Sequence, residues 1–118
     1  MLDPTFASDL AREWIAAWNS HDLERILAHY TDDFAMSSPL IAQRGFDASG
    51  TLRGKDAVRT YWAAGLAKAP DLHFTLEDAL VGPDSVAILY RNQAGGRVVE
   101  VLVVDGAHRV IRGMAHYA

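Results

Sequence analysis

The apolar positions of this chain recur first at helical spacing and later at strand spacing. Near the start they form one stripe, made of Phe6, Leu10, Trp14, Ala17 and Trp18. A stripe of this period predicts an amphipathic helix. Asp3 and Pro4 supply its start, since Asp is a favoured N-cap and Pro is favoured at the first helical position. We expect this helix to break at Asn19 and Ser20.

Two further helices are predicted, with a short strand and a loop between them. The first opens at residues 21–22, and its buried side consists of Leu23, Ile26, Leu27 and Tyr30. The second opens at residues 54–56, ends at Pro70 and buries Val58, Tyr61, Trp62 and Leu66. Residues 34–38 are expected to form the strand, with Phe34, Met36 and Ser38 on one face. Residues 40–53 are expected to form a long loop, a feature that is often a functional lid.

The second half of the chain is predicted to be β-structure. The strand-like segments are residues 72–81, 85–93, 97–105 and 109–117. They are separated by short turns rich in Gly, Pro and Asp, and such short connections produce an antiparallel meander. The sequence therefore predicts one α+β domain over residues 1–118, with three N-terminal helices packed on a curved, mostly antiparallel sheet.

The segment at residues 97–105 is apolar on both faces. Val98 and Leu102 fall on one side, and Val99, Val101 and Val103 fall on the other. An antiparallel sheet with one face in water would alternate between apolar and polar residues. Because a large apolar patch rarely stays exposed, we expect the valine-rich outer face to form a homodimer.

Composition narrows the range of functions. The chain has no cysteine and a formal net charge of -4. Thiolate chemistry and cysteine-ligated metal sites are therefore excluded, and the acidic balance argues against a nucleic-acid partner. No apolar run is long enough to span a membrane, and the first residues lack the features of a signal peptide. We expect a small soluble cytoplasmic protein without a membrane partner.

Three motifs and the final meander resemble the nuclear transport factor 2-like superfamily, in its SnoaL-like and ketosteroid-isomerase-like branch. The motifs are WNSHDL at residues 18–23, YTDD at 30–33 and GKDAV at 54–58. The resemblance covers nearly the whole chain and implies a cone-shaped fold around a pocket. The superfamily includes isomerases, epoxide hydrolases, polyketide cyclases, dehydratases and noncatalytic binding modules, so the fold does not decide the reaction.

The resemblance to ketosteroid isomerases implies roles for individual positions. Their general-base aspartate corresponds to Ser38, and their oxyanion-hole tyrosine corresponds to Trp14. Their two supporting tyrosines match Trp62 and Tyr30, and their protonated aspartic acid matches Glu100. The chain keeps the family's carboxylic acid but not its base or phenolic donor, so ketosteroid isomerisation is not expected.

The resemblance to the epoxide hydrolases and cyclases of this fold implies a carboxylate near the position of Ala115. This chain has alanine there, so that acid is also missing.

Glu100 is the candidate acid–base residue. The neighbours of Glu100 along its strand are all apolar, which places its carboxyl group inside the domain. Desolvation there raises a carboxyl pKa and leaves the group partly protonated. The structural alternative is a buried glutamate neutralised by an ion pair.

The partner of Glu100 depends on the turn between residues 85–93 and 97–105. A turn with an even number of residues puts Arg91 on the face of Glu100. A three-residue turn puts Tyr90 and Asn92 there instead, with Arg91 outside. We favour the first arrangement, in which Glu100 and Arg91 are the catalytic residues. The first suits a carboxylate or phenolate ligand, and the second suits a neutral hydroxyl or carbonyl.

The expected pocket wall is apolar and aromatic with a few polar groups, as is typical of small-molecule sites. Its expected residues are Trp14, Trp18, Tyr30, Phe34, Met36, Ser38, Trp62, Leu66, Tyr90, Asn92, Leu102 and Tyr117. Plain core packing is the alternative for each of them. We expect Ala115 and Tyr117 to face inward and His116 outward, whereas His116 as a general base would need the opposite register. The histidines lack metal-ligand spacing, so neither a metal nor a cofactor is expected.

Two functions from different classes fit these features. The first is a cofactor-independent isomerase, cyclase or hydrolase that uses acid–base chemistry at Glu100 on a small, apolar or aromatic, oxygenated molecule. The second is a noncatalytic dimeric module that binds a small molecule or is purely structural.

Overall fold

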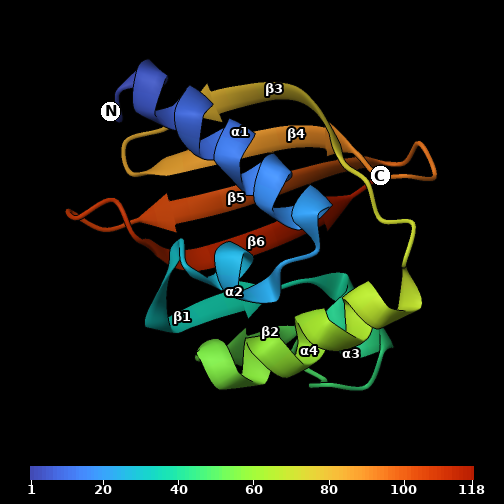
Figure 1. The fold of residues 1–118 in the computed structure, drawn as a ribbon. Helices are drawn as coiled ribbons and strands as arrows, with labels where there is room; N and C mark the ends of the chain where they lie inside the picture. The colour runs from blue at the N-terminus through green and yellow to red at the C-terminus, as the bar shows by residue number, and fades with distance from the viewer.

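The computed structural model describes residues 1–118 and contains one six-stranded sheet with helices packed against it (Figure 1). Its strands are β1 (Tyr30–Ser37), β2 (Thr51–Arg53), β3 (Thr75–Val81), β4 (Ser85–Arg91), β5 (Arg97–Val104) and β6 (Val110–Tyr117). They lie in the order β2-β1-β6-β5-β4-β3. All neighbours are antiparallel except β1 and β6, which are parallel. The predicted α+β cone and its curved, mostly antiparallel sheet are confirmed.

The structure has four helices, one more than the sequence predicted. They are α1 (Pro4–Ser20), α2 (Leu23–Leu27), α3 (Pro39–Gln43) and α4 (Lys55–Lys68). The expectation of a continuous loop over 40–53 was wrong, because α3 and β2 lie inside that range. Ser38 caps α3, since its hydroxyl accepts a hydrogen bond from the Leu40 N–H at 3.2 Å. Pro39 then occupies the first helical position, a local signal that favours helix.

Local signals set both ends of α1. The Asp3 side chain accepts a hydrogen bond from the Thr5 N–H at 2.7 Å, and Pro4 opens the helix. At the other end, His21 takes a left-handed conformation with φ 59° and donates its backbone N–H to the Trp18 carbonyl. The helix therefore begins and ends where the sequence predicted.

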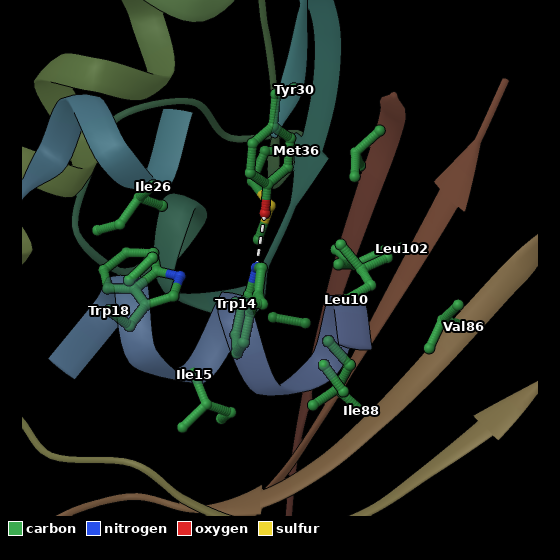
Figure 2. Packing of buried hydrophobic residues seen from close by; sticks show 14 of the residues in the cluster. Leu10, Trp14, Ile15, Trp18, Ile26, Tyr30, Met36, Val86, Ile88 and Leu102 are labelled. Atoms are coloured by element: carbon green, nitrogen blue, oxygen red, sulfur yellow. Dashed lines mark hydrogen bonds between the residues drawn. The ribbon is translucent and has the colours of Figure 1, made fainter. Parts of the chain in front are cut away.

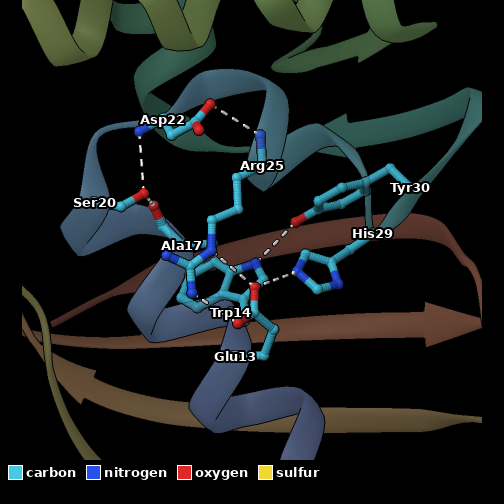
Figure 3. A network of polar contacts seen from close by, with 8 residues as sticks. All are labelled: Glu13, Trp14, Ala17, Ser20, Asp22, Arg25, His29 and Tyr30. Atoms are coloured by element: carbon cyan, nitrogen blue, oxygen red, sulfur yellow. Dashed lines mark hydrogen bonds and ion pairs between the residues drawn. The ribbon is translucent and has the colours of Figure 1, made fainter.

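A polar network on the surface ties α1 to α2 (Figure 3). Arg25 donates two hydrogen bonds to the Glu13 carboxylate, at 2.8 and 3.2 Å, and His29 lies 3.2 Å from the same carboxylate. The Arg25 and Glu13 side chains are both over a third exposed, and exposed ion pairs of this kind contribute little to stability. The network links α1 to α2 at the surface.

Strand β1 begins earlier than expected. Tyr30 is its first residue and lies opposite Val110 of β6, whereas the sequence placed Tyr30 on the preceding helix and began the strand at residue 34. The discrepancy arises from Asp32 and Asp33, which are exposed and resemble turn residues. The parallel β1–β6 pairing brings the first third of the chain beside its last strand.

The core lies between α1 and the inner face of the sheet. Trp14, Tyr30 and Phe34 are among its largest fully buried side chains. A buried indole N–H usually finds a hydrogen-bond partner, and the Nε1–H of Trp14 donates to the Tyr30 hydroxyl at 2.9 Å (Figure 2). No helix in the structure has the length and apolar character that crossing a membrane requires.

Candidate functional site

The β4–β5 turn decides which residues face Glu100. Residues 93–95 form a three-residue turn, closed by a hydrogen bond from the Asn92 N–H to the Gly96 carbonyl at 2.9 Å. Gly95 has φ 82°, the left-handed conformation that three-residue hairpins use at their last position. This register places Ile88 opposite Glu100 and Tyr90 opposite Val98. Tyr90 and Glu100 therefore share the inner face.

Arg91 lies on the outer face, away from Glu100. Its Nε donates to Glu77 at 3.0 Å, and its Nη1 donates to the Gly95 carbonyl at 2.9 Å. The predicted Arg91–Glu100 pair is wrong, because the turn has an odd number of residues and reverses the face on which Arg91 emerges. The three-residue alternative, which places Tyr90 and Asn92 on the side of Glu100, matches the structure.

A cavity of about 180 Å³ opens between α1, α4 and the inner face of the sheet. Besides Glu100, the predicted residues that line it are Trp14, Trp18, Met36, Ser38, Trp62, Tyr90, Asn92 and Tyr117. Most of its wall is apolar. This composition is typical of sites for small molecules.

Four residues expected in the wall lie elsewhere. Tyr30, Phe34 and Leu102 are fully buried in the core, and Leu66 packs against the core from α4. The Tyr30 hydroxyl accepts a hydrogen bond from the Trp14 indole within the core, and the residue is fully buried, so the phenol lies behind the cavity wall. The periodic pattern identified these residues as inward-facing without distinguishing core from cavity.

The sequence missed several lining residues. They are Leu40, Arg44, Tyr61, Gly65, Ala69, Leu72, Phe74, Gln93, Val98 and Ala115. Tyr61, Val98 and Ala115 were already expected to face inward, so their positions carried a usable signal. Arg44 carried none, because residues 40–53 were assigned no packing partner.

The WNSHDL motif fastens part of the cavity wall to α1. The Asn19 amide donates to the Phe74 carbonyl at 2.9 Å, and its oxygen accepts from the Phe74 N–H at 2.7 Å. Nε2 of His21 lies 2.8 Å from the Leu72 carbonyl. Phe74 in turn packs on Tyr90, with ring centroids 4.4 Å apart. The motif thus positions two of the lining residues, Leu72 and Phe74.

Glu100 is the buried acid of the cavity. Its exposed fraction is 3%, and its carboxyl takes part in none of the hydrogen bonds or ion pairs within the protein. Desolvation raises its pKa to about 8. At neutral pH the group is mostly protonated, so it presents a hydrogen-bond donor to the cavity. The structural alternative, a glutamate neutralised by an ion pair, does not apply.

The phenols near Glu100 stay protonated at physiological pH. Burial, and then the Glu100 charge, raises the pKa of Tyr90 above its ordinary value. Tyr117 is 43% exposed, and the partial burial of its phenol raises its pKa to about 12, although a hydrogen bond with the Ser38 hydroxyl partly offsets this increase. Burial also raises the pKa of Tyr61. These groups can therefore donate hydrogen bonds while Glu100 gains or loses its proton.

The Asn92 side chain and the Trp18 indole differ in how far their hydrogen-bonding groups are already paired within the protein. The Asn92 side-chain oxygen already accepts from the N–H groups of Ala94 and Gly96, at 3.0 and 2.9 Å, so it braces the turn and leaves only its NH₂ for other partners. The Trp18 Nε1–H is buried without a hydrogen-bond partner. Its ring forms a T-shaped pair with Trp62 at 5.1 Å, a geometry in which an N–H can meet an aromatic face.

The last strand follows the expected register. Ala115 and Tyr117 line the cavity, whereas His116 lies opposite Val99 on the outer face. His116 is therefore not placed to act as a base on a ligand in the cavity. No three or more His, Asp or Glu side chains gather in an arrangement that could hold a metal ion.

Solved structures share this fold. A SnoaL-like protein of unknown function from Burkholderia thailandensis E264 is 49% identical, with a TM-score of 0.94 over 98% of this chain and 97% of that chain. SalBIII, an epoxide hydrolase/cyclase-like enzyme with a role in pyran ring formation in salinomycin, is 17% identical, with a TM-score of 0.77 over 100% and 95%. A candidate isomerase of the SnoaL-like family from Agrobacterium tumefaciens C58 is 17% identical, with a TM-score of 0.77 over 97% and 98%. Curated proteins give no match.

The two structures at 17% identity show the fold alone. The Burkholderia protein is similar over nearly its whole length and is itself SnoaL-like. The family model of the SnoaL-like domain matches residues 11–118. This chain belongs to the SnoaL-like family.

Proposed function

We propose that this chain is a cofactor-independent acid–base enzyme, an isomerase, cyclase or hydrolase, acting on a small and mostly apolar oxygenated molecule. The observation that carries the proposal is Glu100, a carboxyl group buried in a cavity wall with no partner in the protein and a pKa of about 8. A group whose pKa lies near the working pH can give a proton in one step and take one in another. The enzymes with this fold support the class of function by analogy.

In the proposed chemistry, a single carboxyl group, Glu100, moves one proton. For a ketone, the ionised form of Glu100 removes the proton next to the carbonyl, and the electron pair of that C–H bond moves into an enolate. The phenols of Tyr90 and Tyr117 donate hydrogen bonds to the charged oxygen, which replaces the role first given to Arg91. Protonated Glu100 then returns the proton to carbon, so the residue is regenerated without a cofactor. For an epoxide, protonated Glu100 gives its proton to the oxygen as the C–O bond breaks, and a water molecule or a hydroxyl group of the substrate forms the new C–O bond. The proton released by that hydroxyl group or water returns to Glu100, so the acid is regenerated.

The partner proposed for this chain is a second copy of itself, through the outer sheet face. Val99, Val101 and Val103 are partly exposed there, and Val101 lies between Ala87 and Met114 of the neighbouring strands. Leu80, opposite Ala87, is 53% exposed. A contiguous apolar face of this kind marks an interaction surface.

A noncatalytic binding module is the second candidate, and one observation favours it. The family resemblance implies carboxylates in catalytic relatives at the positions of Ser38 and Ala115, and this chain has none there. Glu100 is the only carboxyl group in the cavity wall. The cavity, the aromatic wall and the proposed dimer would serve a binding role equally well.

Hydrogen exchange in D₂O separates the two functions without knowledge of the natural product. Cyclic ketones that bind are incubated with the protein, and exchange of the protons beside the carbonyl is followed by NMR. We expect the protein to accelerate exchange and Glu100→Gln to abolish it while still binding the ketone. Binding by the unaltered protein with no acceleration of exchange in ketones and lactones, and no ring opening of epoxides that bind, would favour the binding module.

A further inference from the structure

Arg44 is the one cationic side chain in the cavity wall. It follows α3, where its backbone N–H bonds to the Leu40 carbonyl at 2.9 Å. Its guanidinium reaches α4, because a Cβ atom at Gly65 would lie 3.5 Å from Nη1 of Arg44. Its charge also lowers the pKa of the Tyr61 and Tyr117 phenols, against the larger effect of burial. The guanidinium therefore lies over α4 with both phenols within its electric field.

The Arg44 guanidinium has no partner within the protein. Arg12, Arg25, Arg59 and Arg91 are each paired with a carboxylate. Arg44 takes part in none of these ion pairs, although Asp47 lies only three residues away and bonds instead to Ser49. Arg53, Arg97, Arg109 and Arg112 are also without an ion pair, but none of them lines the cavity. A guanidinium offers five N–H donors in a fixed geometry. Those of Arg44 have no acceptor within the protein and lie at the edge of the apolar cavity.

We propose that the cavity binds a monocyclic carboxylate, with the carboxylate on Arg44 and the oxygenated end of the ring toward Glu100. The inference rests on the proposed function only in taking Glu100 as the inner end of the site. Arginine pairs with a carboxylate through two parallel hydrogen bonds. Because Arg44 supplies a single positive charge and Glu100 is mostly neutral at pH 7, a monoanion matches the cavity better than a phosphate dianion.

The volume of the cavity limits the ligand to one ring. At about 180 Å³ it slightly exceeds the ~150 Å³ apolar cavity that accommodates benzene. Trp14, Trp62 and Phe74 supply flat apolar surfaces to the wall. A single aromatic or alicyclic ring fits this space, and its carboxylate extends toward the mouth, where Arg44 is exposed to solvent.

Matched ligand pairs test the role of Arg44. The probes are 4-oxocyclohexanecarboxylate with its carboxamide, and 4-hydroxybenzoate with 4-hydroxybenzamide, titrated by calorimetry or ligand-observed NMR at pH 7. We expect each acid to bind about tenfold more tightly than its amide, since a charge-assisted pair is worth more than a neutral hydrogen bond. Arg44→Gln should remove this preference by weakening only the acids. Arg53→Gln, which alters an unpaired arginine outside the cavity, should leave it intact.

Either of two results overturns the inference: neither acid binds the unaltered protein better than its amide, or Arg44→Gln weakens acid and amide equally. Glu100→Gln separates this test from that of the proposed function. If 4-oxocyclohexanecarboxylate keeps its advantage over the amide in Glu100→Gln and loses it in Arg44→Gln, the carboxylate site stands whether or not exchange is catalysed.

Discussion

The indole N–H of Trp14 is hydrogen-bonded to the hydroxyl of Tyr30 at 2.9 Å, across the interface between α1 and β1 (Figure 2). The resemblance to ketosteroid isomerases implied functional tyrosines at both positions. In this chain the Trp14 indole N–H has its acceptor in the Tyr30 hydroxyl, and Tyr30 is fully buried. The pair therefore links a residue of the cavity wall, Trp14, to a residue of the core, Tyr30.

Tyr30→Phe should destabilise the protein by about 1–3 kcal/mol, because it leaves the buried Trp14 N–H without an acceptor. Urea denaturation of the variant measures the loss. In a double-mutant cycle, Trp14→Phe should cost less in the Tyr30→Phe background than in the unaltered protein. A Tyr30→Phe variant as stable as the unaltered protein would show that the hydrogen bond contributes nothing.

Glu100 should make the protein less stable as pH rises. Its pKa is about 8 in the folded protein against an ordinary 4.5, so between these values the folded state holds a proton that the unfolded state has released. The stabilising effect of the protonated group is complete below pH 4.5 and is lost as pH rises through 8, by about 1.4 kcal/mol per pKa unit.

Glu100→Gln should remove this dependence. Urea denaturation between pH 5 and 9 should show the variant gaining stability relative to the unaltered protein as pH rises, with a plateau above about 8. Tyr90, Tyr117 and Tyr61 face the same cavity, but their raised pKa values keep them out of this range. Parallel stability curves for the two proteins would contradict the raised pKa of Glu100.

Asn19→Ala should loosen the cavity wall. It leaves the Phe74 N–H and carbonyl without their partners, and we expect a loss of about 1–3 kcal/mol with faster amide exchange at Phe74. Asn19→Asp is the matched control, since it keeps the acceptor for the N–H and removes only the donor. Its effect should be intermediate. If both variants lose the same stability and amide exchange at Phe74 is unchanged, the hydrogen bonds between Asn19 and Phe74 do not hold the cavity wall.

Val101→Glu should convert the proposed dimer into a monomer, because it introduces a charge at the centre of the outer sheet face. Sedimentation velocity on both proteins measures the change. Ala63→Glu adds the same charge on the exposed side of α4 and should not alter the mass. A monomeric unaltered protein would remove the dimer from the proposal.

Local signals in the sequence predicted most of the elements, but the site depends on details that are not local. Asp3 and Pro4 were enough to place the start of α1. The β4–β5 turn contains Gly95 and Gly96, and either could have taken the left-handed conformation; because Gly95 does, Arg91 emerges on the outer face. Arg44 reaches the cavity because the end of α3 lies near α4, where its guanidinium approaches Gly65. This contact joins distant parts of the chain, so no pattern within residues 40–53 predicts it.

The parallel pairing of β1 with β6 also has a consequence for biosynthesis. Tyr30 pairs with Val110, eighty positions along the chain by the difference 110 − 30, so β1 leaves the ribosome long before its neighbour exists. A newly synthesised strand whose backbone N–H and C=O groups are unpaired can associate with other chains. The charged pair Asp32 and Asp33 sits in the part of β1 that β2 does not cover. Charged side chains at a strand edge disfavour such association, and Asp32 and Asp33 place two of them on β1 before β6 has been synthesised.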